Sequence, residues 1–298
     1  MWNIGFLIAP SADLWKPYTD AFEAQLKSHL KNGEDFKIEY RAAGGLQKLY
    51  REIAKDFADP GRTPPIDIIV TGGTGAVLAC KKATSKIPIV FATAGDPINS
   101  GLVASKPTGN LTGISNQQTN LVIKRLNYMR DNLTPDMGKK IHMSAIGNDG
   151  VPNVQLEKKI VADVARDLGL KFSISPPLKT QDDIGPVITK LKRRGVNTLF
   201  ICTDPLITTN AEIINKLALD NKLVTMHAFR LNYGKQGLMF YGPRFPDMFK
   251  RAADFVYEIL SGAKGPADIP VEEARAFESK CNKKIAGMLG LKALFATL

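Results

Sequence analysis

Residues 66–76 read Ile-Asp-Ile-Ile-Val-Thr-Gly-Gly-Thr-Gly-Ala, an apolar run that passes directly into a turn of small polar residues. A short apolar run bounded by turn residues is typical of a strand that is buried on both faces of a parallel sheet. The glycines predict a tight turn, and the following residues, 76–83, predict a short helix. This stretch therefore indicates a strand, turn and helix unit of an α/β fold.

The same pattern recurs along the chain. Other apolar runs end in polar turns at 93–97, 147–150 and 203–205. In an open parallel sheet, such turns all lie at the carboxyl ends of the strands, where ligands bind. The recurrence predicts a scaffold for a polar small-molecule site.

The order of the predicted elements indicates two α/β lobes, each a doubly wound parallel sheet. Strands and helices alternate through residue 115, and the pattern restarts with a helix at 121–133. A further strand at 237–241 and a helix at 249–260 follow the second series, so we expect the chain to cross back and complete the first lobe. The expected lobes are 1–115 with 242–265, and 116–241 with 266–298. They would be joined by a hinge of several crossings.

Composition excludes several classes of protein. With 298 residues, 44% of them hydrophobic, the chain buries a large core and fits two domains better than one. The formal charge of +11 comes from basic pairs spread along the sequence. The densest group, 190–194, ends a predicted helix, where cations complement the helix dipole. We therefore expect no nucleic-acid partner, and no run of about 18 apolar residues predicts a membrane span.

Motifs for catalysis or metal binding are not found. Three cysteines (Cys80, Cys202 and Cys281) and three histidines (His29, His142 and His227) lack metal-ligand spacing, and no P-loop or nucleophile elbow occurs. Gly73, Gly75 and Asp96 imitate part of a dinucleotide fingerprint, but Leu78 stands where the third glycine belongs. We expect neither a metal, a cofactor nor an enzyme activity.

Several short motifs, in order and at matching spacing, resemble the periplasmic substrate-binding proteins of ABC transporters. The resemblance is to the type I fold family that includes tryptophan and related amino-acid binding proteins, and it covers nearly the whole chain. The residues that carry it are 38–41, 71–76, 83–91, 95–97, 101–103, 109–113, 204–206, 237–239, 241–243 and 289–291. The segment 273–284 is more charged than the family pattern.

The resemblance implies a two-lobed clamp that closes on a small solute and presents it to an ABC permease in the membrane. It also implies a monomer that works in the periplasm or otherwise outside the cytoplasm. Residues 2–9 already alternate as a core strand, so no export signal is recognised in this sequence. An amino acid or a related small carboxylate is the expected solute.

The predicted site residues come from the strand-end turns. Gly73, Thr74 and Gly75 let backbone amides of a helix amino terminus approach an anion, with Thr74 as helix N-cap, ligand donor or both. Ser11 lies in the turn after the first strand, and Trp15 follows it in the same loop. The Trp15 indole either stacks on a ligand or packs the loop onto its helix.

Three acids, Asp96, Asp149 and Asp204, end different strands and either accept hydrogen bonds from a ligand or cap local turns. Asn148 shares that ambiguity. Phe229 and Tyr233 follow the last regular strand of the second series and are candidates for an opposing wall. Two alternatives stay open: a cytosolic ligand-sensing domain with the same clamp, and an α/β enzyme.

Overall fold

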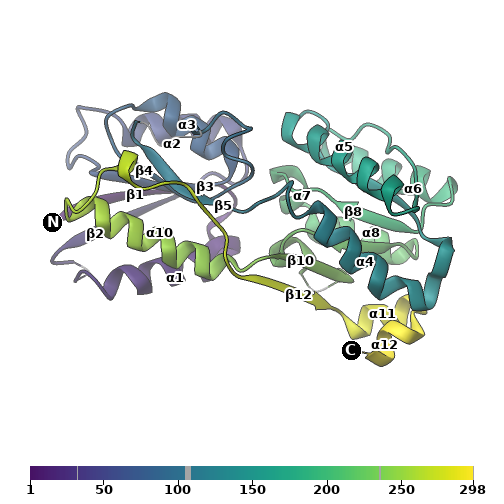
Figure 1. Ribbon diagram of the computed structural model, residues 1–298. Coiled ribbons are helices and arrows are strands. Elements are labelled where there is room, and N and C mark those ends of the chain that lie inside the picture. The colour runs from purple at the N-terminus through teal and green to yellow at the C-terminus, as the bar shows by residue number, and fades with distance from the viewer. Residues whose placement is uncertain (32, 105–108, 235, 298) are drawn as a thin grey trace. The chain divides into compact units, whose positions relative to one another are not determined.

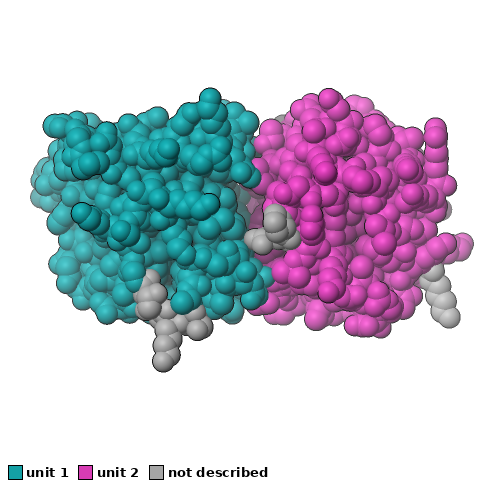
Figure 2. All heavy atoms as spheres, turned by 90° about the horizontal axis from the view of Figure 1, so that it is seen from above, with its two compact units in different colours: residues 1–117, 243–276 teal, residues 118–242, 277–298 magenta. Residues whose placement is uncertain are grey.

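The computed structural model describes residues 1–31, 33–104, 109–234 and 236–297. They divide into two compact units (Figure 2). Unit 1 consists of residues 1–117 and 243–276, and unit 2 of residues 118–242 and 277–298. The chain therefore passes between the units three times, and each unit is an α/β layer of the predicted kind (Figure 1).

Unit 1 is a six-stranded sheet in the order β11-β5-β4-β3-β1-β2, and the pairs whose registers are determined are parallel. Its strands are β1 (Trp2–Ile8), β2 (Phe36–Ala42), β3 (Ile68–Gly72), β4 (Ile89–Ala94), β5 (Leu111–Ser115) and β11 (Glu272–Glu273). Its helices are α1 (Ala12–Lys27), α2 (Gln47–Phe57), α3 (Thr74–Ala83) and α10 (Phe245–Leu260). A 3-10 turn, Pro266–Asp268, precedes β11.

Aromatic side chains fill the core of unit 1 on one face of the sheet. There α1 and α10 pack side by side (Figure 1). The ring of Phe6 on β1 meets that of Phe22 at 5.2 Å, and Phe249 of α10 packs on Trp15 at the same centroid distance. Because β3 and β4 are buried along their whole length, the sheet is covered on both faces, as their continuous apolar sequence predicts.

Unit 2 is a second six-stranded sheet, in the order β12-β10-β9-β8-β6-β7. Its strands are β6 (His142–Ile146), β7 (Lys171–Phe172), β8 (Thr198–Ile201), β9 (Val224–His227), β10 (Met239–Pro243) and β12 (Phe277–Cys281). Its helices are α4 (Val122–Met137), α5 (Pro152–Asp167), α6 (Ile184–Arg193), α7 (Pro205–Thr209), α8 (Ala211–Asp220), α9 (Arg230–Tyr233), α11 (Lys283–Leu289) and α12 (Lys292–Thr297). Two 3-10 turns, Gly138–Lys140 and Gln181–Asp183, complete it.

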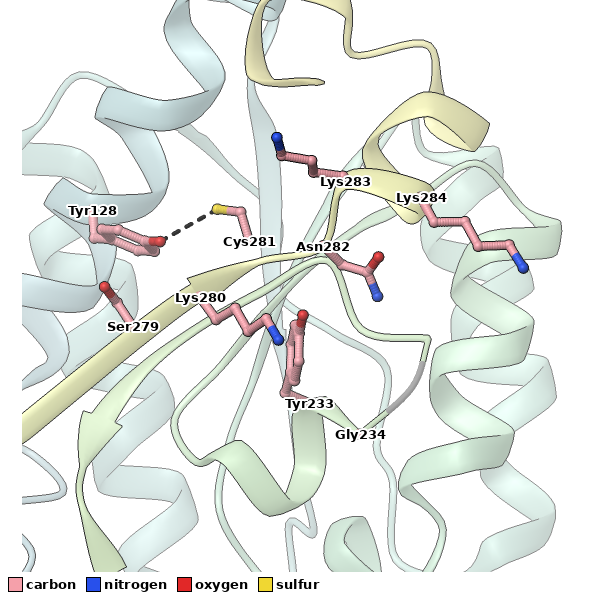
Figure 3. A pocket seen from close by; sticks show the side chains of 9 residues that line it. All are labelled: Tyr128, Tyr233, Gly234, Ser279, Lys280, Cys281, Asn282, Lys283 and Lys284. Carbon is pink, nitrogen blue, oxygen red and sulfur yellow. Dashed lines mark hydrogen bonds between the residues drawn. The ribbon is translucent and has the colours of Figure 1, made fainter. Parts of the chain in front are cut away.

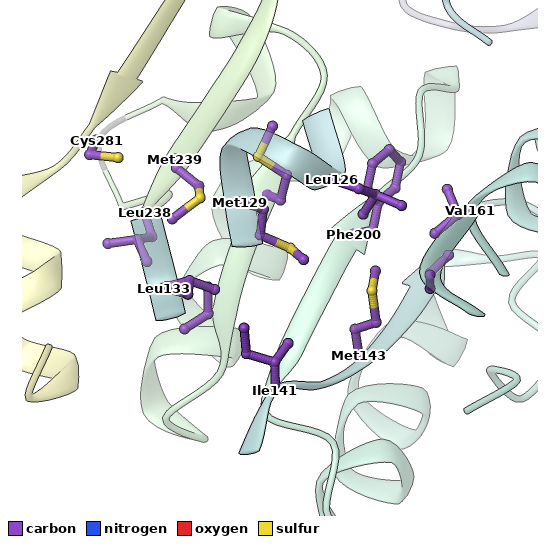
Figure 4. Close-up of a cluster of buried hydrophobic side chains, with 14 of the residues drawn as sticks. Leu126, Met129, Leu133, Ile141, Met143, Val161, Phe200, Leu238, Met239 and Cys281 are labelled. Carbon is purple, nitrogen blue, oxygen red and sulfur yellow. The ribbon is translucent and has the colours of Figure 1, made fainter. Parts of the chain in front are cut away.

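Two apolar layers cover the sheet of unit 2. On one face, Leu126 and Met129 of α4 pack against Met143 and Phe200 (Figure 4). On the other face, α6 and α8 bury Leu191 and other apolar residues against β8. Because helices cover both faces of the sheet, polar groups that bind a ligand are expected at the strand ends.

The structure moves one expected boundary by eleven residues and the other two by one or two residues. The sequence placed residues 266–298 in the second lobe, whereas 266–276 belongs to unit 1. Glu272 of β11 lies beside Ile114 of β5, and the Ala274 amide donates to the Ser115 carbonyl at 2.9 Å. A strand of two residues has too little apolar pattern to be read from sequence, so the pairing that fixes this segment was not visible there.

Gly242, near the end of β10, lies very close to the backbone of the segment after β9. A Cβ at this position would lie 1.9 Å from the Ala228 carbonyl oxygen, which is backbone and cannot turn aside. We expect Gly242→Ala to lower the free energy of unfolding by about 3 kcal/mol in urea denaturation.

Gly75→Ala is the matched control, because the added Cβ would lie 3.4 Å from Tyr50, an ordinary contact. Its free energy of unfolding should change by less than about 1 kcal/mol. Equal destabilisation by the two variants would contradict the close approach of β10 to the segment after β9.

Candidate functional site

The carboxyl ends of three neighbouring strands bring predicted residues of unit 1 together. Ser11 follows β1, residues 73–75 follow β3, and Asp96 follows β4. Because β1 pairs with β3 and β3 with β4, all in parallel, these segments lie along one edge of the sheet. The sequence prediction of a common edge within this unit is confirmed.

The amino terminus of α3 is the best-defined feature of this edge. Gly73, with φ of 84°, is its N-cap, and the Gly73 amide donates to the Thr93 carbonyl at 2.7 Å. Thr74 is therefore the first residue inside the helix, not the N-cap expected as one alternative, and its hydroxyl donates to the Gly95 carbonyl at 3.4 Å. Thr74 is half-buried and Gly75 is exposed. The first amides of a helix have no partner inside the helix, so they can donate to an anion.

Ser11 precedes α1 at the same edge. It is exposed, it takes the extended N-cap conformation, and its hydroxyl makes no capping hydrogen bond. The Ser11 hydroxyl is thus not committed to its own helix.

Trp15 is a correction to the sequence analysis. It lies inside α1, not in a loop, and only 5% of it is exposed. Its ring meets Phe249 edge to face, and a Cβ at Gly72 would lie only 2.7 Å from the indole. Of the two alternatives, packing describes Trp15 in this structure.

Asp96 occupies a strained position. Its φ is 48°, which is unusual for a residue other than glycine, and its carbonyl accepts from the Ser100 amide at 2.9 Å. The turn that it forms holds the chain at the end of β4, so a structural role is present whatever else its half-buried carboxylate contacts.

Asn116, which the sequence analysis missed, stands at the same edge directly after β5. Its side-chain amide donates to the Thr93 hydroxyl at 3.1 Å, and its buried Oδ1 has no hydrogen-bond partner among the described residues. The rule that selected Asp96, a polar residue at the end of an apolar strand, would also have found Asn116. An open acceptor at this position suits an ammonium or hydroxyl donor.

In unit 2, Asp204 is a capping residue. Its two carboxylate oxygens accept from the Ile207 amide at 3.0 Å and from the Asn148 amide at 2.8 Å. Burial raises the pKa of Asp204, while those backbone hydrogen bonds act in the opposite direction. The side chain thus joins the loops that follow β6 and β8, which is the local alternative that the Asp-Pro sequence allowed.

Asn148 and Asp149 are likewise engaged within unit 2. The Asn148 side chain accepts from the Gly150 amide at 2.9 Å. Asp149 pairs with Lys158 at 2.8 Å and accepts from the Leu178 amide at 2.7 Å. These bonds shape the loop after β6.

A buried ion pair lies beneath these loops, and the sequence analysis did not find it. Arg125 and Glu157 have fully buried side chains, with Nη1 and Oε1 4.0 Å apart. The other carboxylate oxygen, Oε2, accepts from the Gln118 side chain at 2.8 Å and from the Thr203 amide at 3.2 Å. Burial raises the pKa of Glu157 and lowers that of Arg125 to about 10, with the opposite charge counteracting both shifts.

The two aromatic residues predicted for the site in unit 2, Phe229 and Tyr233, have different surroundings. The half-buried Phe229 ring has the Arg125 guanidinium carbon at 6.0 Å from its centroid, so it belongs to the network just described. Tyr233 instead packs on Phe240 and lines a cavity of about 780 Å³ with Cys281 and Asn282 (Figure 3).

This cavity is not at the carboxyl edge of the sheet. The Asn282 amide donates to the carbonyl of Leu238, the residue before β10, so the cavity lies at the amino end of that strand. Tyr233 therefore does not line the edge where the sequence analysis placed it.

Metal and thiol chemistry are not indicated by the part of the chain that the structure describes. No group of three or more His, Cys, Asp or Glu side chains there is arranged to hold a metal ion. All three cysteines are buried and unbridged, and burial raises the pKa of each. Among the described helices, none has the length and apolar character needed to cross a bilayer.

Comparison with known proteins identifies the family of this chain. The family described as ABC transporter substrate binding protein matches residues 15–294. The chain belongs to this family. It therefore has the type I periplasmic binding fold that the resemblance implied, and it is a substrate-binding protein of an ABC transporter, a family that works outside the cytoplasm.

Individual relatives are more distant. A tyrosine-binding protein of Clostridioides difficile is 26% identical over 268 residues, which are 89% of this chain and 74% of the relative. A crystal structure from Streptococcus pneumonia, an ABC domain in complex with L-Trp, has a TM-score of 0.85 and 22% identity, covering 97% of this chain and 94% of that one. A ligand-free, open substrate-binding protein with adhesive properties from Clostridium difficile has a TM-score of 0.72 and 22% identity, covering 97% and 95%. At this identity the solved structures establish the fold.

The stability of unit 2 should depend on the buried pair of Arg125 and Glu157. Arg125→Met leaves the Glu157 carboxylate buried without its counter-charge, so we expect a loss of about 3–5 kcal/mol in the free energy of unfolding, measured in urea. The double variant Arg125→Met/Glu157→Met should be more stable than the single variant, because it removes both charges together. Additive losses in this double-mutant cycle would contradict the coupling.

The stability of the protein should depend on pH through His227. It ends β9, it is fully buried, and neither ring nitrogen has a partner among the described residues. Burial lowers the pKa of His227 from its ordinary value of 6.5 to about 3. Between these two pH values the unfolded chain is protonated at this position and the folded chain is not, so acid favours unfolding.

We expect the free energy of unfolding to fall below pH 6.5, with His227 contributing up to about 1.4 kcal/mol per pH unit. His227→Leu should make the slope between pH 6.5 and 4.5 shallower by that amount. The measurement is urea denaturation at several pH values in this range, and an unchanged slope would show that His227 is not buried in its neutral form.

Proposed function

We propose that this protein captures a free amino acid outside the cytoplasmic membrane and delivers it to an ABC permease. The observation that carries the proposal is the open amino terminus of α3 in unit 1. Its amides are suited to the α-carboxylate, and the unpartnered Oδ1 of Asn116, which follows β5 two strands away at the same edge, suits the α-ammonium. One zwitterionic ligand would satisfy both groups.

The relatives support the same solute class. One is named for tyrosine and another was solved with L-Trp, so an aromatic amino acid is the first candidate. In unit 2, the half-buried ring of Phe229 offers apolar contact area of the kind that an aromatic solute side chain uses. Ligand contact with both units would favour a closed state over an open one, with the three chain crossings as the hinge.

In this proposal the solute leaves unchanged, the protein acts as a monomer, and no nucleic acid takes part. A thermal-shift screen of the purified chain against the common L-amino acids, a set of sugars and nicotinamide cofactors tests it. We expect L-tryptophan or L-tyrosine to raise the midpoint, with sugars and cofactors inactive. A shift with sugars or cofactors and none with any amino acid would overturn the proposal.

Thr74→Pro tests the role of the α3 amides. Proline is well tolerated at the first position of a helix, but it removes the amide and the hydroxyl of residue 74. We expect the Kd for the amino acid that gives the largest shift to rise by about 10-fold or more, because a hydrogen bond to a charged group is lost.

Thr74→Val is the matched control, because it keeps the amide and removes only the hydroxyl. Titration calorimetry should show less than about a threefold change in its Kd, and both variants should unfold within about 1 kcal/mol of the parent. Equal affinity of Thr74→Pro and the parent would remove α3 from the binding site.

A further inference from the structure

The positive charge of this protein is concentrated in one unit. Unit 2 holds 22 of the 40 Lys and Arg residues and 12 of the 29 Asp and Glu residues, a formal charge of +10. Unit 1 holds 18 basic and 17 acidic residues, a charge of +1. A partner with negative charge would therefore be attracted to unit 2.

Within unit 2, exposed cations gather at the amino-terminal edge of the sheet, opposite the carboxyl edge described above. Helices that cover a parallel sheet run back against the strands, so their carboxyl ends lie at this edge, where basic residues complement the dipole. α6 ends in Arg193, and Lys222 stands between α8 and β9. β12 ends beside the start of β10, which brings the lysines after it to the same edge.

We call this surface the basic edge. Its exposed members are Lys140, Lys171, Lys190, Lys192, Arg193, Arg194, Lys222, Lys280, Lys283, Lys284 and Lys292. None of these side chains forms an ion pair within the described part of the chain, in contrast to Arg41, Arg62 and Arg251 of unit 1. Two nearby acids already have partners of their own. Asp136 accepts from the amides of Ala293 and Leu294, and Asp220 pairs with Lys216. A third acid, Asp167, is exposed.

The cations do not converge on one point. In Figure 3, the side chains of Lys280, Lys283 and Lys284 extend in different directions around the cavity at the amino end of β10. The edge itself spans six strands, roughly 24 Å at about 4.8 Å per strand. A broad array of unpaired lysines matches an extended anionic surface better than a single small anion.

Two exposed apolar side chains stand beside the cations. Ile174 is 81% exposed, and its carbonyl accepts from Arg194 at 3.0 Å. Met288 is 47% exposed, and its carbonyl accepts from Lys222 at 2.9 Å. Cations with exposed apolar side chains among them are the combination that binds a lipid interface, where the apolar groups enter between headgroups.

We infer that the basic edge of unit 2 docks on the surface of a membrane that contains anionic phospholipids. The contact holds the protein at the bilayer by the end of unit 2 that is remote from the carboxyl edge. It does not use the strand-end loops or α3, so it leaves the proposed solute site free.

Vesicle co-sedimentation of the full chain tests this inference. At 50 mM salt, vesicles with 30% phosphatidylglycerol in phosphatidylcholine should bind the protein, and pure phosphatidylcholine vesicles should not. Lys190→Gln/Lys192→Gln/Arg193→Gln should weaken binding to the anionic vesicles by at least about tenfold. Raising the salt to 300 mM should also release the protein, because exposed charges are screened.

The matched control is Lys37→Gln/Lys82→Gln/Lys86→Gln, which removes the same charge from exposed positions of unit 1. It should change vesicle binding by less than about twofold. Equal losses in the two triple variants would show an effect of net charge alone and would overturn the inference, as would equal binding to neutral vesicles. Both triple variants should keep the thermal shift with amino acids, which separates this result from the proposed function.

A second pair of measurements distinguishes a bilayer from an acidic protein. Ile174→Gln/Met288→Gln should weaken vesicle binding by about threefold or more and leave binding to soluble polyglutamate unchanged. Equal effects on both, or binding to polyglutamate with none to vesicles, would assign the basic edge to an acidic polypeptide instead.

Discussion

The places where the chain enters and leaves unit 2 are held together by the buried guanidinium of Arg125. It donates from Nη1 to the Gln118 carbonyl at 2.7 Å and from Nε to the Tyr241 carbonyl at 3.0 Å. Gln118 begins unit 2, and Tyr241 lies next to the point where the chain leaves it. The Tyr241 ring stacks on Phe277, where the chain returns. Arg125 therefore binds the unit 2 side of two crossings directly, and the Tyr241 ring links the third crossing to them.

Such a site is costly to build. An arginine and a glutamate both lose their hydration, and Nη2 of Arg125 and Oε1 of Glu157 have no hydrogen-bond partner within the described residues. The pair supplies a defined geometry. The Glu157 carboxylate accepts from the Thr203 amide, so the ion pair holds the loop after β8 together with the crossings that Arg125 binds. A hydrophobic replacement would pack as well but would leave those backbone groups without partners.

Patterns of burial and chain direction made much of the fold readable from sequence. Strands such as β3 and β4 are buried on both faces, so their continuous apolar runs stand out, and the turns that follow share one edge because the strands are parallel. Trp15 was misplaced because an aromatic residue near a strand end fits a loop and a first helical turn equally well. The bond between Asp204 and the Asn148 amide spans 56 residues, and no local pattern records such a contact.

The basic surface of unit 2 could not be predicted from local sequence patterns either. Along the sequence, the densest basic group of unit 2, residues 190–194, is an ordinary helix end that complements the helix dipole and is followed by Gly195. The topology adds what the sequence conceals, since every helix that returns along a parallel sheet brings its carboxyl end to the same edge. Cations that are unremarkable one helix at a time thus become one surface. Unit 1 is built on the same topology, but acids pair with several of its cations, so the fold alone does not create the charge of unit 2.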